Sequence, residues 1–210
     1  MKRGLNGKEM TRKSRKEILQ DGCFAHIFSR SIEKRYIFKT DCDFNEFQNL
    51  LLHFKKKYPF QIHHYCLMHT HFHIAVSMPD TCLFSKALQE LKWRYTRSFN
   101  KRHKRRGPLW QERFKSLLIE DAQYLYACGI YIEGNPLKAG LVDRSEDWNY
   151  SSASVYTSGE DNPLVDRYEL PSLPEGINWE ERFFTKGTGI GSSLFKIYQR
   201  EECQMWMPVP

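Results

Sequence analysis

An apolar stretch near the start of the chain, residues 22–31, reads GCFAHIFSRS; it is rich in β-forming residues and predicts a β-strand. A helix is expected next, over residues 43–58. Its aromatic and aliphatic side chains recur at helical spacing and give it one buried face: Phe44, Phe47, Leu51 and Phe54. Asp43 or Asn45 is the expected N-cap, and Pro59 ends the helix.

Two more apolar runs, residues 61–68 and residues 71–78, are typical of strands. The short link between them, His69-Thr70, predicts an antiparallel hairpin. Residues 85–103 then predict a second helix, which is strongly basic toward its end, and residues 114–120 predict a fourth strand.

Asp121 is a plausible N-cap for a third helix, residues 122–134, which ends at Gly134-Asn135-Pro136. The order strand, helix, strand, strand, helix, strand, helix is that of an α+β protein with a ferredoxin-like split βαβ arrangement. The expected fold is therefore an antiparallel sheet with an added C-terminal helix that carries tyrosines.

The strand HFHIAVSM has two distinct faces, because side chains alternate along a strand. One face is apolar and is expected to pack under the helices: Phe72, Ile74, Val76 and Met78. The other face, expected to be open, carries His71 and His73 beside the small residues Ala75 and Ser77. Strand geometry puts the Cα atoms of the two histidines roughly 7 Å apart, so that both imidazoles can reach one metal ion.

Two other interpretations of these histidines stay open. They can be ordinary, half-exposed strand residues. Alternatively, a structural zinc site can draw on other histidines and a cysteine nearby: His63, His64, Cys66 and His69. The zinc interpretation is weakened because His63 and His64 are expected to face opposite ways, and because the sequence has no partner pair with finger-like spacing.

The composition adds an expectation about partners and location. The 210 residues carry a formal net charge of +7, which favours an anionic partner, most commonly nucleic acid. No apolar run is long enough for a membrane span. The six cysteines are scattered without a CxxC pair, which indicates reduced thiols in a cytoplasmic protein. We expect a basic arm over residues 1–20, a catalytic domain over 21–156 and an extension of unknown role over 157–210.

A dense group of cations marks the end of the second predicted helix and the loop after it: Lys92, Arg94, Arg97, Lys101, Arg102, Lys104, Arg105 and Arg106. Cations of this kind neutralise phosphates. Trp93, Tyr95 and Phe99 are interleaved with them and suit base stacking, but we expect Trp93 and Phe99 to lie in the core.

Three motifs together resemble the single-tyrosine HUH transposases, in particular the REP-associated tyrosine transposase branch. They are CLMHTHFHIAV, then LWQERF, then YIEGNPLKAGLV, and the resemblance runs from about residue 22 to about residue 156. By this resemblance His71 and His73 are the HUH histidines, Tyr131 is the nucleophile, and Asn135 is a further metal ligand or orienting group. Relatives commonly have Pro-Asn where this chain has His69-Thr70. The resemblance also gives Trp110, Gln111 and Arg113 a structural or DNA-contacting role.

The reaction implied by the resemblance is attack of a tyrosine oxygen on a DNA phosphodiester, which leaves a 5′-phosphotyrosine and a free 3′-hydroxyl. A phenol has a pKa of about 10 and needs activation. A divalent ion, Mg²⁺ or Mn²⁺, is the implied cofactor. The implied substrate is single-stranded DNA with palindromic hairpins, handled by a monomer or a homodimer. The alternative is a non-catalytic nucleic-acid-binding module on the same scaffold.

Overall fold

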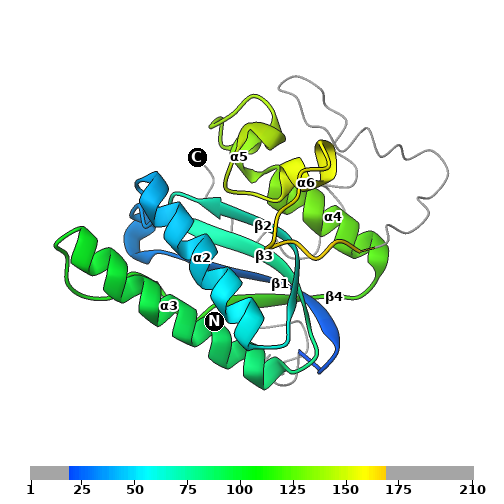
Figure 1. Ribbon diagram of the computed structural model, residues 1–210, viewed down its shortest axis with the longest axis horizontal. Coiled ribbons are helices and arrows are strands. Elements are labelled where there is room, and N and C mark those ends of the chain that lie inside the picture. Colours follow the sequence, from blue (N-terminus) through cyan, green and yellow to red (C-terminus); the bar gives the residue numbers. More distant parts are fainter. Residues whose placement is uncertain (1–18, 169–210) are drawn as a thin grey trace, which may run out of the picture.

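The computed structural model describes residues 19–168, and its central element is a four-stranded antiparallel sheet (Figure 1). The strand order is β2-β3-β1-β4, which is the ferredoxin-like order expected from the sequence. The strands are β1 (Cys23–Arg30), β2 (Gln61–Met68), β3 (His71–Met78) and β4 (Lys115–Ile119). The chain order and the sheet order together confirm the α+β fold.

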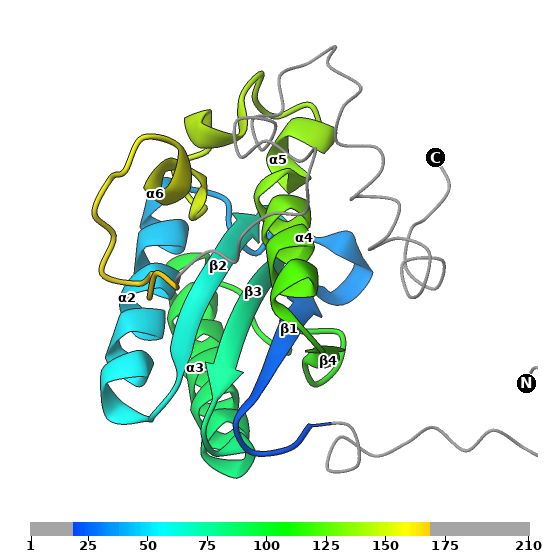
Figure 2. The ribbon, with the colours of Figure 1, turned by 90° about the vertical axis from the view of Figure 1, so that its right-hand side faces the viewer.

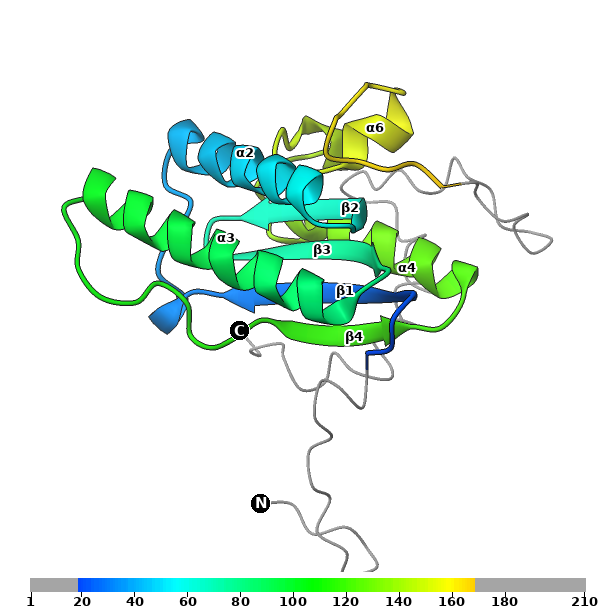
Figure 3. The same cartoon turned by 60° about the horizontal axis from the view of Figure 1, so that its bottom comes forward.

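The helices cover both faces of the sheet. Figure 3 shows α2 (Asp41–Lys57) and α3 (Thr81–Arg102) side by side on one face, and Figure 2 shows α4 (Ala122–Glu133) on the other. Shorter helical segments are α5 (Asn135–Lys138), α6 (Ala153–Thr157) and two 3₁₀ turns, Ile32–Lys34 and Ser145–Asp147. Of the helices within residues 19–168, none has the length and apolar character that crossing a membrane requires.

Two helices begin earlier than the sequence predicted. The N-cap of α2 is Thr40, and Asp43 occupies the third helical position, where its carboxylate accepts the backbone N–H of Thr40 at 3.1 Å. The predicted N-cap, Asp43 or Asn45, is therefore wrong by three residues or more. Helix α3 begins at Thr81, because the Asp80 side chain accepts the backbone N–H of Leu83 and caps it.

The main core lies between the sheet and the pair α2/α3. The predicted apolar face of α2 is buried there, as are the apolar residues of β3: Phe72, Ile74, Val76 and Met78. Tyr95 and Phe99 of α3 are also buried, whereas Trp93 is 56% exposed. The expectation that Trp93 lies in the core is therefore wrong, because its position on α3 points away from the sheet.

The second face of the sheet is not open, as the alternation of β3 alone suggested. Helix α4 covers it and forms a smaller apolar cluster with Ala75 of β3 and Cys66 of β2, to which α4 contributes Leu125, Cys128 and Ile132. These α4 residues are spaced three, four and seven apart, so they share one side of the helix. The histidine face of β3 is thus an interior surface between sheet and helix.

A β-bulge shifts the register of β2 between Ile62 and His64. The extra residue makes His63 and His64 share the face covered by α4: the His63 ring lies 3.1 Å from the Ser77 hydroxyl, and His64 contacts α4. The expectation that these two histidines face opposite ways is therefore wrong, because strict alternation fails at a bulge.

The chain beyond residue 156 continues to pack on the domain. Leu164 joins the main core. The Asp166 carboxylate accepts the backbone N–H of Ile62 and lies 2.8 Å from the Lys55 ammonium. The expected basic arm, apart from Leu19 and Gln20, and residues 169–210 of the expected extension lie outside the described residues.

We predict that Gly129→Ala destabilises the protein. A Cβ atom at this position would lie 2.5 Å from ring atoms of His64, which is fully buried. The strain should lower the free energy of unfolding by about 1–3 kcal/mol, measured by urea denaturation. In a His64→Ala background the same substitution should cost less, because the clashing ring is gone. An equal loss in both backgrounds would show that this contact does not limit the packing of α4.

Candidate active site

The candidate site lies where one end of β1 and β3 meets the C-terminal end of α4. In the antiparallel register, Arg30 pairs with His71 and Phe28 pairs with His73. Because every second residue faces the same way, β1 presents His26, Phe28 and Arg30 toward α4 beside the two histidines of β3. The ring centroids of His71 and His73 are 5.0 Å apart.

Helix α4 places Tyr131 directly against the histidines of its own chain. The ring centroid of Tyr131 lies 5.8 Å from that of His73 and 5.9 Å from that of His26, in both cases edge to face. Asn135 lies one turn further along, where its side-chain amide donates to the backbone carbonyl of Tyr131 at 2.7 Å. The fold therefore brings together Tyr131, His71 and His73, the residues that the resemblance singled out, with Asn135 at the helix end.

A buried polar network fixes the end of α4 that carries Tyr131. Glu133, which is 4% exposed, accepts the Nδ1–H of His64 at 2.7 Å and the hydroxyl of Ser152 at 2.7 Å. Near by, Gly129 lets the helix approach the His64 ring closely. A buried carboxylate needs such partners, and they tie α4 both to β2 and to the segment before α6. The tyrosine therefore lies on a helix end held from two sides.

Each motif histidine uses its Nδ1 atom in a hydrogen bond. His71 Nδ1 lies 2.8 Å from the hydroxyl of Thr70, and His73 Nδ1 lies 2.9 Å from Nε2 of His26. Burial, followed by the charge of Arg30, lowers the pKa of His71 to about 4. Burial also lowers the pKa of His26 to about 3 and that of His73 well below its usual range. The three rings are therefore neutral at pH 7 and carry lone pairs.

Arg30 brings a positive charge to the same place. Burial lowers the pKa of its guanidinium, and the nearby Tyr131 phenol opposes that shift. Neither Arg30 nor His26 was predicted from the sequence. The available signal was the alternation of β1, which puts Phe24, His26, Phe28 and Arg30 on one face. Only the pairing of β1 with β3 shows that this face lies beside His71 and His73.

The donor set fits an open divalent metal site. Neutral His71 and His73 can each offer Nε2 when Nδ1 is the donor in its hydrogen bond, and Asn135 retains an amide oxygen. Two imidazoles and one amide oxygen leave positions for water or phosphate, as Mn²⁺ and Mg²⁺ require. Within residues 19–168 no group of three His, Cys, Asp or Glu side chains is arranged to hold a metal.

The residues of the zinc alternative are used elsewhere in this part of the chain. His69 Nδ1 donates to the carbonyl of Phe38 at 2.9 Å and its ring stacks on Tyr36. His63 lies between Ser77 and the backbone carbonyl of Asp166. Since no three His, Cys, Asp or Glu side chains within residues 19–168 are arranged to hold a metal, these contacts favour structural packing roles over zinc coordination.

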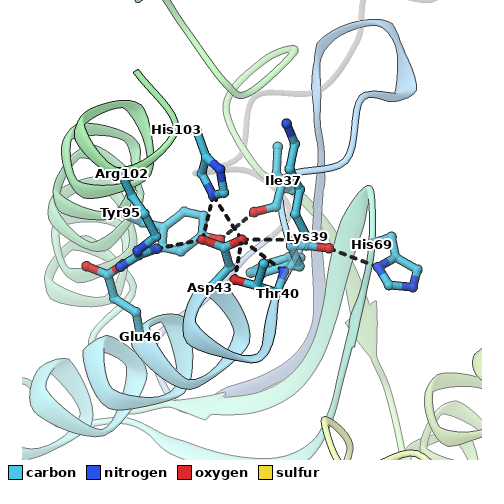
Figure 4. Close-up of polar contacts among 10 residues, drawn as sticks. Ile37, Lys39, Thr40, Asp43, Glu46, His69, Tyr95, Arg102 and His103 are labelled. Carbon is cyan, nitrogen blue, oxygen red and sulfur yellow. Dashed lines mark hydrogen bonds and ion pairs between the residues drawn. The ribbon is translucent and has the colours of Figure 1, made fainter. Parts of the chain in front are cut away.

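Two members of the predicted DNA-binding group have their charged groups paired with protein partners. Lys92 is 8% exposed, and its ammonium donates to the Ser29 hydroxyl and to the Glu112 carbonyl. Arg102 forms ion pairs with Asp43, at 2.5 Å, and with Glu46 (Figure 4). Asp43 lies at the start of α2 and its side chain is fully buried. Its ion pair with Arg102 therefore joins the start of α2 to the end of α3.

The other predicted cations lie nearer the surface. Arg105 shapes the loop after α3 by donating to the Pro108 carbonyl, and Arg94 and Arg97 lie over aromatic rings. The remaining cations are exposed: Lys101, Lys104, Arg106 and Arg113. Lys101 is in the last turn of α3 and the other three lie in the loop after it. This loop reaches the site, since Gln111 donates its backbone N–H to the carbonyl of Arg30.

Trp110 has a structural position. Its indole N–H donates to the Thr96 hydroxyl at 3.1 Å, and its ring packs edge to face on Phe72 in the main core. Gln111 and Arg113, from the same motif, line a hollow at the edge of β1 together with Phe28 and Arg30. The motif thus connects α3 with the end of the sheet that carries the candidate site.

A ferredoxin-like sheet that presents two strand histidines to a tyrosine on a crossing helix is the arrangement expected of single-tyrosine HUH transposases. A family model described as "Transposase IS200 like" matches residues 19–135. The chain therefore belongs to the IS200-like transposase family, a family of DNA-processing enzymes.

Two relatives narrow the likeness. A putative REP-associated tyrosine transposase of Haemophilus influenzae is 32% identical over 118 residues, which span 51% of this chain and 67% of that relative. A solved REP-associated tyrosine transposase, bound to a REP hairpin, matches with a TM-score of 0.61 over 79% of this chain and 99% of that chain. Because only 19% of the aligned residues are identical, this match shows that the two proteins share a fold. These findings confirm the resemblance drawn from the motifs.

Proposed function

We propose that this protein cleaves and rejoins single-stranded DNA that contains hairpins, with Tyr131 as the nucleophile. The observation that carries the proposal is the 5.8 Å separation between the ring centroids of Tyr131 and His73 within one chain. Family membership supports the reaction class, and the hairpin bound to the solved relative supports the kind of substrate. The contact between Tyr131 and His73 within one copy of the chain supports a reaction in which the tyrosine acts in its own protomer.

In the proposed reaction the phenol oxygen of Tyr131 attacks the phosphorus of a DNA phosphodiester. The new O–P bond forms as the bond from phosphorus to the 3′-oxygen breaks, and that oxygen leaves as a hydroxyl after taking up a proton. The phenol proton is lost to solvent or to a nearby base. A later 3′-hydroxyl attacks the 5′-phosphotyrosine, releases Tyr131 and restores a phosphodiester. One ester replaces another, so no nucleotide cofactor is consumed.

His71 and His73 are proposed to hold a divalent ion through Nε2, with Asn135 as a further ligand. When bound, the ion supplies Lewis-acid polarisation of the phosphate oxygens. The pKa shifts of the two rings favour this role, because both histidines are neutral at pH 7 and need not lose a proton before binding.

Arg30 is proposed to stabilise the charge that develops on the phosphate and on the phenol oxygen. It pairs with His71 across the sheet and is close enough to Tyr131 for the phenol to influence its pKa. A guanidinium donates two parallel hydrogen bonds to phosphate oxygens. Its partial burial strengthens this interaction, because screening by water is reduced.

The exposed cations at the end of α3 and in the loop after it are proposed to contact the DNA backbone: Lys101, Lys104, Arg106 and Arg113. They lie on the part of the chain that joins the end of α3 to the edge of β1 beside Arg30. We omit Lys92 and Arg102 from this group, because their charges are satisfied by protein partners. Arg94, Arg97 and Arg105 are also left out of this group, because Arg94 and Arg97 lie over aromatic rings and Arg105 donates to the Pro108 carbonyl.

We expect a covalent protein–DNA adduct with a single-stranded hairpin oligonucleotide in Mn²⁺. The label is placed at the 3′ end, because the tyrosine retains the 5′-phosphate of the downstream strand. Tyr131→Phe should reduce adduct formation at least about 10³-fold, and His71→Ala, His73→Ala or removal of the metal with EDTA should also abolish it. Tyr124→Phe, on the same helix, is the matched control. Hairpin binding without any adduct in the wild-type protein would favour the non-catalytic binding module instead.

Arg30→Gln should slow adduct formation in a single-turnover assay by about 10²-fold, because it removes a charge-stabilising donor. Affinity for the hairpin should change far less than the rate. Arg144→Gln provides a control, since Arg144 forms an exposed ion pair with Glu146. A fall in affinity that accounts for the whole loss of rate would assign Arg30 to binding rather than to the chemical step.

Arg106→Gln and Arg102→Gln should act differently. Arg106→Gln should weaken hairpin binding and reduce the slope of log affinity against log salt by about 0.7–0.9, with unchanged stability. Arg102→Gln should lower the free energy of unfolding by about 1–3 kcal/mol, because the buried Asp43 carboxylate loses a partner. Filter binding over a salt series and urea denaturation measure the two effects. Similar salt slopes for Arg106→Gln and wild type would exclude Arg106 from the phosphate contacts.

A further inference from the structure

His26 and His73 are two buried histidines joined by a hydrogen bond, and the proposed reaction assigns no role to His26. His26 is on β1, 47 positions before His73 in the sequence, and its Nε2 lies 2.9 Å from Nδ1 of His73. We propose that His26 is a positioning residue that holds His73 in the tautomer with its proton on Nδ1 and its lone pair on Nε2, directed to the metal. This inference rests on the proposed function.

The argument begins with the valence of imidazole. A neutral ring has one nitrogen that donates and one that accepts. If Nδ1 of His73 donates to His26, the lone pair of His73 is on Nε2 and can bind a metal. If His26 donates instead, the proton of His73 is on Nε2 and the ring cannot bind there. The direction of this one hydrogen bond therefore decides whether His73 is a competent ligand.

The second motif histidine has a matching partner. Nδ1 of His71 lies 2.8 Å from the Thr70 hydroxyl, which can accept the Nδ1–H. Thr70 and His26 thus act on the same atom of the two rings, and both leave Nε2 for the ion. Partners of this kind orient metal-binding histidines.

The sheet leaves His73 little freedom to turn. Phe28 is its cross-strand partner and stacks on its ring at 5.8 Å between centroids, while His71 lies edge-on at 5.0 Å. His26 pairs across the sheet with Ala75, so its ring stands over a small residue and can lean toward His73. Both rings are nearly inaccessible to solvent, at 2% and 7% exposed. Water therefore cannot readily replace His26 as the acceptor.

Three substitutions separate this role from simple packing. His26→Phe keeps the ring volume and removes the acceptor. His26→Gln keeps an acceptor oxygen at a comparable reach. His53→Phe, at an exposed position on α2, controls for the loss of a histidine elsewhere.

The first measurement is ¹⁵N NMR of the histidine rings in metal-free protein. We expect His73 in the wild type to be protonated on Nδ1, and His26→Phe to populate the other tautomer. A wild-type His73 that carries its proton on Nε2 would overturn the proposal. This readout needs neither metal nor DNA, so it is independent of the proposed reaction and of whether the adduct forms.

The second measurement is Mn²⁺ affinity by titration calorimetry, with thermal melting as the test of folding. His26→Phe should weaken Mn²⁺ binding by about 10–100-fold, whereas His26→Gln should restore it and His53→Phe should leave it unchanged. A folded His26→Phe with wild-type Mn²⁺ affinity and an unchanged His73 tautomer would refute the positioning role. If His26→Phe does not fold, the wild-type tautomer and the His26→Gln affinity still decide.

Discussion

The close contact between α4 and the sheet is the constraint on which the candidate site depends. The backbone of α4 at Gly129 lies against the His64 ring, and Glu133 one turn later binds the same ring and Ser152. Apolar residues of the helix fill the space between. Tyr131 lies between these two contacts in the sequence of α4, and the contacts hold its ring beside His73 and His26. A helix held less closely would leave the Tyr131 ring without a defined distance to the histidines.

The site is assembled from residues that differ in sequence position but share one corner of the fold. β1 contributes Arg30 and His26, β3 contributes the paired histidines, and α4 contributes the phenol. Burial keeps the imidazoles neutral while Arg30 supplies positive charge. This combination agrees with the proposed role of the site, because a phosphate would be attracted by Arg30 without protonation of the imidazoles that are proposed to hold a metal.

The sequence predicted the elements whose signals are local. The two faces of β3 and the Asp121 cap of α4 follow from alternation and from side-chain chemistry at a helix start, and both agree with the structure. The predicted N-cap of α2 was wrong because Asp is favoured both at the N-cap and in the first turn of a helix, so the sequence does not distinguish the two positions of Asp43. The bulge at His63 left no local signal, so strict alternation gave the wrong face.

The candidate site was predictable only in part. The histidine pair and Tyr131 were found through motifs, and the fold then brought them together. His26 and Arg30 were missed because their relevance depends on which strand pairs with β1, a non-local fact. Lys92 could not be distinguished from the cations around it, since only the approach of Ser29 and Trp110 shows that its ammonium points inward.

The sheet separates two kinds of surface. The histidines and Tyr131 lie between the sheet and α4, whereas α2 and α3 pack on the opposite side (Figure 3). Changes on the outward side of α3 therefore reach Tyr131 and the histidines only through the strand ends and the loop near Arg30. Evolution can remodel the charge of that outer surface while the packing of Tyr131 against His73 and His26 is preserved.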